Sequence, residues 1–197
     1  MASLDVVLAC VQLVVVGTPT PPDVVHHATK QAAAIWRPHG VLIAAEGDLT
    51  ACPADAPTES VTVVMTAINA TSAKLRLPRL GQIDFAGDGM PDPEIVIASE
   101  YLQQQVERAT WSGQPLANRP PTLRRQAAGR AIGRVLAHEL GHYLLRMPSH
   151  GREGLMRPVY SIPALLEPQT RKYRLGESDA ARLGALLLNR RIHVTRR

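Results

Sequence analysis

The chain has 197 residues, of which 45% are hydrophobic and seven are aromatic, and its formal net charge is +5. This length allows one packed core, so we expect residues 1–197 to form a single domain built mainly from Val, Leu, Ile and Ala. No apolar run reaches the roughly 18–20 residues that span a membrane. Two cysteines are too few for a disulfide framework or a cysteine-rich zinc site.

The charge is divided unevenly along the sequence. Residues 1–118 carry 6 Lys/Arg and 12 Asp/Glu, whereas residues 119–197 carry 16 and 5. A solvated layer of cationic helices is the ordinary interpretation of the basic part, and an acidic substrate, an anionic cell surface or nucleic acid are the sharper ones. No aromatic interleaving and no nucleic-acid motif favours nucleic acid as the partner.

The N-terminal segment predicts a β-α-β unit. Val11–Val16 is a β-branched, nearly continuous apolar run, which is typical of a strand covered on both faces. Residues 1–9 are either a disordered end or the remnant of a secretory signal, although no basic residue precedes the apolar run as a signal normally requires. Asp23 is placed to cap a helix that reaches Trp36, and Val41–Ala45 follows as a second strand, parallel to the first.

This unit separates the two cysteines. Cys10 lies near the start of the first predicted strand, and Cys52 lies just past the end of the second. These are opposite ends of a parallel pair, so we expect no Cys10–Cys52 disulfide.

Three more strands are predicted before the basic part of the chain. They are Ser60–Thr66, Leu80–Phe85 and Glu94–Ser99. The acidic segment Asp84–Pro93 lacks the spacing of a calcium loop, so an ordinary solvated turn is favoured over a calcium site. Residues 110–121, rich in Pro, Gly and Asn, predict a loop.

Two helices are predicted in the basic part. Thr122 would cap a long helix that reaches about Arg146 and is stopped by Pro148. Glycines at two positions of this helix would allow close packing. A last helix spans about Ser178–Asn189, and residues 190–197 form a basic tail.

The long helix carries His138-Glu139-Leu140-Gly141-His142. Histidines four residues apart on a helix point the same way, roughly 6 Å apart at Cβ, which suits two imidazoles on one zinc ion. Glu139 leans over the same face, where it could take a proton from water. The motif therefore predicts a zinc hydrolase in which Glu139 is the general base. An ordinary helix ion pair of Glu139 is the weaker alternative.

A catalytic zinc site needs a third protein ligand. His150 is the next histidine, and the chain can turn at Pro148 to bring it back. Glu167 and Glu177 are the rival third ligands, although neither lies in a helical Glu-x-x-x-Asp setting. The other histidines are expected to be structural or solvated: His26, His27, His39 and His193.

The segment from His138 to Pro158 resembles the metzincin metallopeptidases, whose motif is H-E-x-x-H-x-x-G-x-x-H followed by a methionine-bearing turn. Leu145 stands here at the glycine position, and His150 comes two residues later than the pattern. Met156, in Gly-Leu-Met-Arg-Pro, is similar to the Met-turn of the matrix-metalloproteinase branch. Most of the chain also resembles bacterial proteins of unassigned function that carry Ala-His-Glu-x-Gly-His and Ser-His motifs.

The resemblance implies an α+β, zincin-like fold. It would have a mixed, mostly parallel, twisted five-stranded sheet, an N-terminal crossover helix, a long active-site helix and a C-terminal helix. One catalytic zinc would be held by His138, His142 and His150 above Met156, and the reaction would be endopeptidase hydrolysis. Tyr160 and Arg157 are weaker candidates for oxyanion stabilisers.

A peptide or protein substrate is the implied partner, and it could pair with an edge strand, for which Glu94–Ser99 is the candidate. We expect a monomer without an inhibitory propeptide in this chain, acting outside the cytoplasm as most metzincins do. The alternatives from other classes are a catalytically inactive zinc-binding module and an Arg-rich protein that binds anions or nucleic acid.

Overall fold

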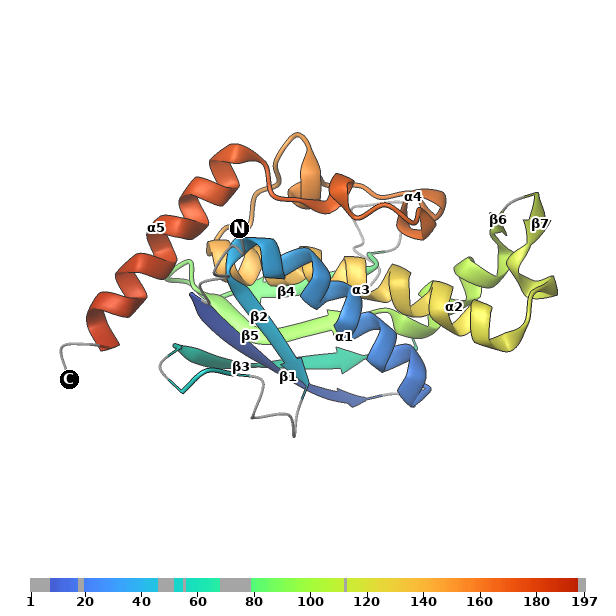
Figure 1. Ribbon diagram of the computed structural model, residues 1–197, viewed down its shortest axis with the longest axis horizontal. Coiled ribbons are helices and arrows are strands. Elements are labelled where there is room, and N and C mark those ends of the chain that lie inside the picture. The colour runs from blue at the N-terminus through green and yellow to red at the C-terminus, as the bar shows by residue number, and fades with distance from the viewer. Residues whose placement is uncertain are drawn as a thin grey trace, which may run out of the picture.

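Helices cover one face of a twisted five-stranded sheet in the computed structural model of the chain (Figure 1). The structure describes residues 8–17, 20–45, 52–54, 56–67, 79–111 and 113–194, with side chains as far as residue 189. The strands of the sheet are β1 (Ala9–Gly17), β2 (Val41–Ala45), β3 (Thr58–Met65), β4 (Gly81–Phe85) and β5 (Pro91–Ile97). The helices are α1 (Pro22–Trp36), α2 (Ser99–Arg108), α3 (Pro121–Leu145), α4 (Ile162–Leu166) and α5 (Glu177–Val194).

The strand order is β2-β1-β3-β5-β4. All neighbouring pairs are parallel except β4 with β5, which is antiparallel. The predicted α+β class and the mixed, mostly parallel five-stranded sheet are therefore confirmed. None of the helices in the described part of the chain is long and apolar enough to cross a membrane.

Two expectations about the strands are wrong. The segment Glu94–Ser99 is not an edge strand, because β5 lies between β3 and β4 and its last two residues already belong to the turn and helix that follow. The two edges of the sheet are β2 and β4, and β4 pairs antiparallel with the strand β5 that follows it. The first strand is not covered on both faces either. Buried Leu13 alternates with half-buried Gln12 and Val14, since α1 and α3 lie on one face of the sheet only.

The expected separation of the cysteines is also wrong, because Cys10 and Cys52 form a disulfide with a Cα–Cα distance of 5.8 Å. The strand β3 runs parallel to β1, so the chain that leaves β2 must return to the end of the sheet where β1 begins. Cys10 pairs in register with Thr58, and its N–H donates to the carbonyl of Pro57. Cys52 lies on this returning segment and so reaches Cys10.

The helix α3 packs against α1 through glycines, as predicted. A Cβ on Gly133 would lie 2.4 Å from the carbonyl oxygen of Ala28, and one on Gly129 would meet the His27 side chain equally closely. The expected side-chain caps are wrong. Pro21 and Pro120 occupy the N-cap positions of α1 and α3, neither cap makes a side-chain hydrogen bond, and each helix has a proline in its first turn.

Three segments differ from the prediction in kind or extent. Helix α2 was not predicted. Most of its residues are polar, and only two buried apolar side chains, Leu102 and Val106, mark its inner face. The predicted loop at residues 110–121 contains a small hairpin of β6 (Thr110–Trp111) and β7 (Gln114–Pro115). Helix α5 runs to Val194, so residues 190–194 of the expected tail are helical.

Candidate metal centre

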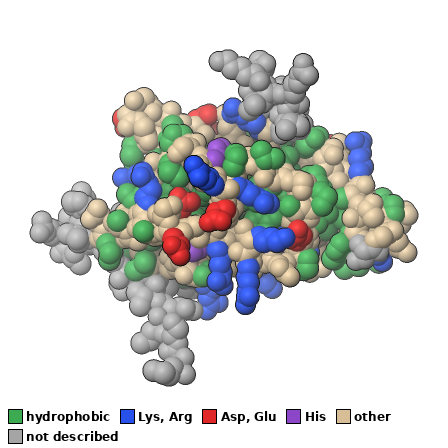
Figure 2. Space-filling model, turned by 90° about the horizontal axis from the view of Figure 1, so that it is seen from above, with side chains coloured by type: hydrophobic (Ala, Val, Ile, Leu, Met, Phe, Trp, Pro, Cys, Tyr) green, Lys and Arg blue, Asp and Glu red, His purple; other side chains and the backbone are tan. Residues whose placement is uncertain are grey.

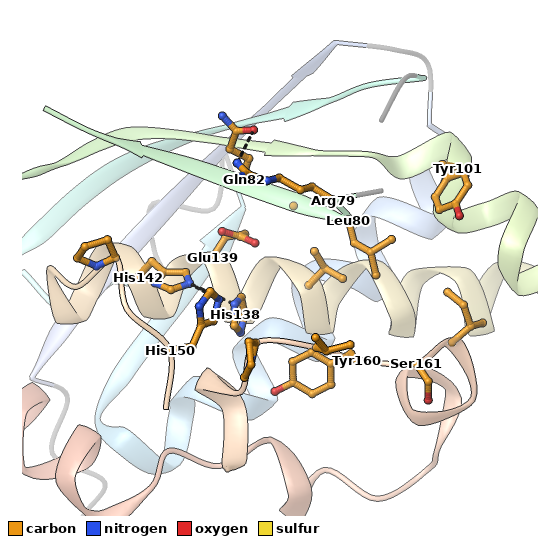
Figure 3. Close-up of a pocket in the computed structure, with 16 residues that line it drawn as sticks. Arg79, Leu80, Gln82, Tyr101, His138, Glu139, His142, His150, Tyr160 and Ser161 are labelled. Carbon is orange, nitrogen blue, oxygen red and sulfur yellow. Dashed lines mark hydrogen bonds between the residues drawn. The ribbon is translucent and has the colours of Figure 1, made fainter. Parts of the chain in front are cut away.

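Helix α3 positions His138 and His142 on one buried face (Figure 3). The Nδ1 atom of His138 lies 2.7 Å from the carbonyl oxygen of Leu155, and the Nδ1 atom of His142 lies 2.6 Å from that of Met147. A carbonyl can only accept a hydrogen bond, so each Nδ1 carries the proton and each Nε2 presents a lone pair. Both rings are thus held as metal-ligand tautomers.

The Nε2 atoms of the three histidines converge. His142 Nε2 lies 3.2 Å from His138 Nε2 and 3.3 Å from His150 Nε2. Two nitrogens bound to one zinc at about 2.0–2.1 Å in a tetrahedron are roughly 3.3 Å apart. The Nε2 lone pairs of these histidines point toward one another at these distances and repel unless a cation lies between them. The three imidazole nitrogens therefore fit a zinc ion. These three histidines are close enough to bind a metal ion, and the described residues contain no other such group.

The chain reverses after α3 without the glycine of the metzincin pattern. Leu145 ends the helix, and Arg146 takes the left-handed conformation (φ 49°) that a glycine would normally adopt. Arg182 of α5 donates to the carbonyl oxygens of Leu145 and Arg146 and so holds the turn. In the longer loop that follows, the carbonyl of Met147 accepts the hydrogen bond from His142. The loop also brings the exposed His150 next to His138 and His142.

Met156 lies directly beneath the metal-binding helix. Its side chain is fully buried, and a Cβ on Gly141 would lie 2.3 Å from its sulfur, so the glycine of the helix motif makes room for it. The carbonyl of Met156 accepts from the N–H of Gly151, next to His150. The segment that carries Met156 therefore supports two of the histidines, because Leu155 in the same turn holds His138.

Glu139 is buried beside the histidines and is 7% exposed. Burial raises its pKa to about 8, against a smaller lowering by the positive charge of Arg79. It packs against the edge strand, where a Cβ on Gly81 would lie 2.6 Å from Glu139 Oε1 and 2.7 Å from Val135 Cγ1. The absence of a side chain at Gly81 allows β4 to approach the glutamate. The residues around Gly81 in the sequence did not indicate that this glycine would contact Glu139.

A cavity of about 650 Å³ opens above His138 and Glu139. Its upper wall is the start of β4, and its lower wall is the chain that follows Met156 (Figure 3). Apart from the histidines, Glu139 and Arg79, the wall is largely apolar: it includes Leu80, Tyr101, Val135, Val159 and Ile162. The site thus combines a water-accessible metal position with a hollow large enough for a side chain.

The histidines are held in the neutral form. Burial lowers the pKa of His138 to about 4, and it lowers the pKa of His142 and His150 as well. Neutral imidazole is the form that binds zinc, so protons compete little with the metal at pH 7.

Tyr160 does not point its hydroxyl at the metal position. Its single O–H proton lies between the carbonyl oxygens of Gly154 and Leu155, at 2.7 and 2.6 Å from the hydroxyl oxygen, and so braces the carbonyl that holds His138. The Arg157 guanidinium lies over the Tyr160 ring, 4.1 Å from its centroid, and does not line the cavity. Neither side chain is placed as the oxyanion stabiliser considered above.

The support of Tyr160 continues into α3. Its ring stacks on Tyr173, and the buried guanidinium of Arg134, which belongs to α3, lies 4.1 Å from the centroid of the Tyr173 ring. Arg134 also donates to three backbone carbonyls, those of Ala164, Leu165 and Gln169. Arg134 therefore anchors the lower wall of the cavity to α3.

The rival ligands lie elsewhere. Glu167 is half-buried and forms an ion pair with Lys172 at 2.7 Å. Glu177 begins α5 and is not grouped with the three histidines. In the acidic segment, Asp88 accepts from the N–H of Met90 and Asp84 accepts from Gln82, as in an ordinary turn.

A comparison with protein-family models finds no match, and a comparison with curated protein sequences finds none either.

Proposed function

We propose that the protein is a zinc-dependent endopeptidase of metzincin-like architecture. The observation that carries this proposal is the convergence of three neutral imidazoles with a buried glutamate beside them at the floor of an open cavity. A purely structural zinc site has four protein ligands and leaves no coordination position for water. A carboxylate beside the metal, as Glu139 is here, would have no function in such a site.

The three histidines and Glu139 have different roles in the proposed reaction. Zinc bound by His138, His142 and His150 would supply Lewis-acid activation of water and of the substrate carbonyl. Glu139 accepts a proton from the attacking water and passes it to the leaving amine. Burial raises the pKa of Glu139 in the metal-free protein, and a bound dication would lower it again, toward the range in which a carboxylate can take up and release a proton at neutral pH.

The substrate binds as an extra strand on β4. This strand is the edge of the sheet beside the site, and its first residues border the cavity. An extended peptide there gains backbone hydrogen bonds from the strand, and antiparallel pairing is the slightly more stable direction. An apolar side chain next to the cleaved bond fills the hollow between Leu80, Val135 and Ile162.

The disulfide Cys10–Cys52 supports an oxidising compartment, since cytosolic proteins rarely keep one. We therefore propose that the protein acts outside the cytoplasm. The face that carries α5 shows Lys/Arg intermixed with Asp/Glu (Figure 2), which does not favour a nucleic-acid surface there.

Metal analysis and peptide cleavage test the proposal. We expect about one zinc per chain, lost in His138→Ala and weakened in His150→Ala but kept in His26→Ala, whose exposed histidine lies on α1. Glu139→Ala should keep the zinc and lose hydrolysis of an internally quenched peptide library, whereas Glu100→Ala on α2 should keep both. A zinc-loaded protein that cleaves no peptide would favour the inactive zinc-binding module instead.

A further inference from the structure

The wall of the cavity contains a single arginine and no lysine among its described residues. This residue is Arg79, two positions before β4 begins, and the one carboxylate of the wall is Glu139. Zinc bound by three neutral histidines would add two further positive charges to this hollow. The cavity would then carry a net positive charge, which attracts anionic groups of a substrate.

The Arg79 side chain is placed over the cavity, and most of its donors have no hydrogen-bond partner among the described residues. It is exposed at its position but extends along β4 toward Gln82, above Glu139 (Figure 3). Its one recorded contact is a long one, 3.5 Å from Nη1 to Gln82 Oε1. Gln82 is held in turn by Asp84, 2.8 Å from its amide nitrogen, so its oxygen is kept turned to the arginine.

No carboxylate of the described residues forms an ion pair with Arg79. A guanidinium offers five N–H donors in a planar fork that fits a carboxylate. Apart from the long contact with Gln82 and the charge of Glu139 below it, the described residues leave the fork available to a ligand.

The direction of β4 decides which part of a substrate meets this fork. The strand runs from Gly81 to Phe85, so Arg79 lies beyond its N-terminal end. A peptide antiparallel to β4 runs the opposite way, and the residues after the cleaved bond then lie beside Leu80 and Arg79. The apolar hollow takes the side chain next to the bond. The backbone of Arg79 lies on the side of the positions that follow, and its side chain reaches back along β4 toward the bond.

We propose that Arg79 is a specificity-determining residue that binds a peptide carboxylate on the C-terminal side of the cleaved bond. This inference rests on the proposed peptidase function. The carboxylate can belong to an Asp or Glu side chain or to the free C-terminus of a short peptide, since both offer the same two oxygens. An exposed guanidinium–carboxylate pair is expected to change specificity by about two- to fivefold.

Matched peptides test this proposal. A quenched peptide that the zinc-loaded protein cleaves is remade with Glu or Gln at each of the first three positions after the bond, and each version is made with a free or an amidated C-terminus. The ratio of kcat/KM within each pair is measured for the parent, Arg79→Gln and Arg79→Glu. Arg108→Gln is the control, because Arg108 is an exposed arginine on α2 outside the cavity.

We expect the parent and Arg108→Gln to prefer one carboxylate-bearing member by about two- to fivefold, less so at 0.5 M salt. Arg79→Gln should abolish this preference and Arg79→Glu should reverse it. Binding of the same peptides to zinc-loaded Glu139→Gln, with and without Arg79→Gln, should follow the same order without turnover. A preference for Glu over Gln identifies a side chain, and a preference for the free acid identifies the C-terminus.

Equal ratios in the parent and Arg79→Gln, or an effect confined to positions before the bond, would overturn the proposal while leaving the peptidase function intact. A parent protein that cleaves no peptide overturns the peptidase function, and the role of Arg79 with it.

Discussion

Ionisation of Glu139 should make the metal-free protein less stable as the pH rises. Burial raises the pKa of this carboxyl from 4.5 to about 8, so the folded state holds the proton more tightly than the unfolded chain does. The stability that the proton brings is complete below pH 4.5 and is lost as the pH rises through about 8. The substitution Glu139→Gln removes the titration and keeps the shape of the side chain.

The size of the effect follows from the pKa difference. Each pKa unit corresponds to about 1.4 kcal/mol, so Glu139→Gln should be more stable than the parent by roughly 3 kcal/mol at pH 7. The gain should reach about 4 to 5 kcal/mol above pH 8 and vanish near pH 4. The side chain is only 7% exposed, so solvent screens this effect little. Titration of the histidines affects both proteins and largely cancels in the difference.

Urea unfolding of chelator-treated protein at pH 5, 7 and 8.5 measures this difference. The same pair loaded with zinc is the control, because a nearby dication favours the ionised carboxylate and should shrink the gap. An equal difference between parent and variant at all three pH values would refute the buried, proton-holding environment of Glu139.

Three further substitutions test the supports of the site. Gly81→Ala should displace β4 from the helix and reduce peptide hydrolysis at least tenfold with zinc retained, whereas Gly87→Ala, where a Cβ meets nothing within 4 Å, should leave the rate unchanged. Tyr160→Phe should cost about 1 kcal/mol in urea unfolding and about tenfold in zinc affinity against a chelator. Tyr173→Phe, which loses a hydrogen bond to Ala164, should cost stability alone, so a similar loss of zinc affinity in both would argue against bracing by Tyr160. Arg146→Gly should raise stability by about 0.5–1 kcal/mol with zinc binding kept, and a loss of stability would show that contacts of the arginine outweigh its left-handed backbone.

Residue spacing in the sequence was enough to predict those features that depend only on the geometry of a single helix or strand. A four-residue spacing puts His138 and His142 on one face wherever a helix forms. The apolar run Val41–Ala45 predicted a strand, and the glycines of α3 predicted close helix packing, because both depend on side-chain size and period rather than on distant partners. These features were confirmed.

The positions of distant segments relative to one another could not be predicted from the sequence in the same way. The sequence alone determined an α+β chain with two metal-ligand histidines, a glutamate between them and a candidate third histidine. Only the tertiary structure decided that β4, not β5, is the edge beside Glu139, that Cys52 returns to Cys10, and that Arg146 makes the turn that brings in His150. Each of these depends on strand order or on contacts between segments far apart in the chain, and residue periodicity carries no information about which distant segment will lie alongside.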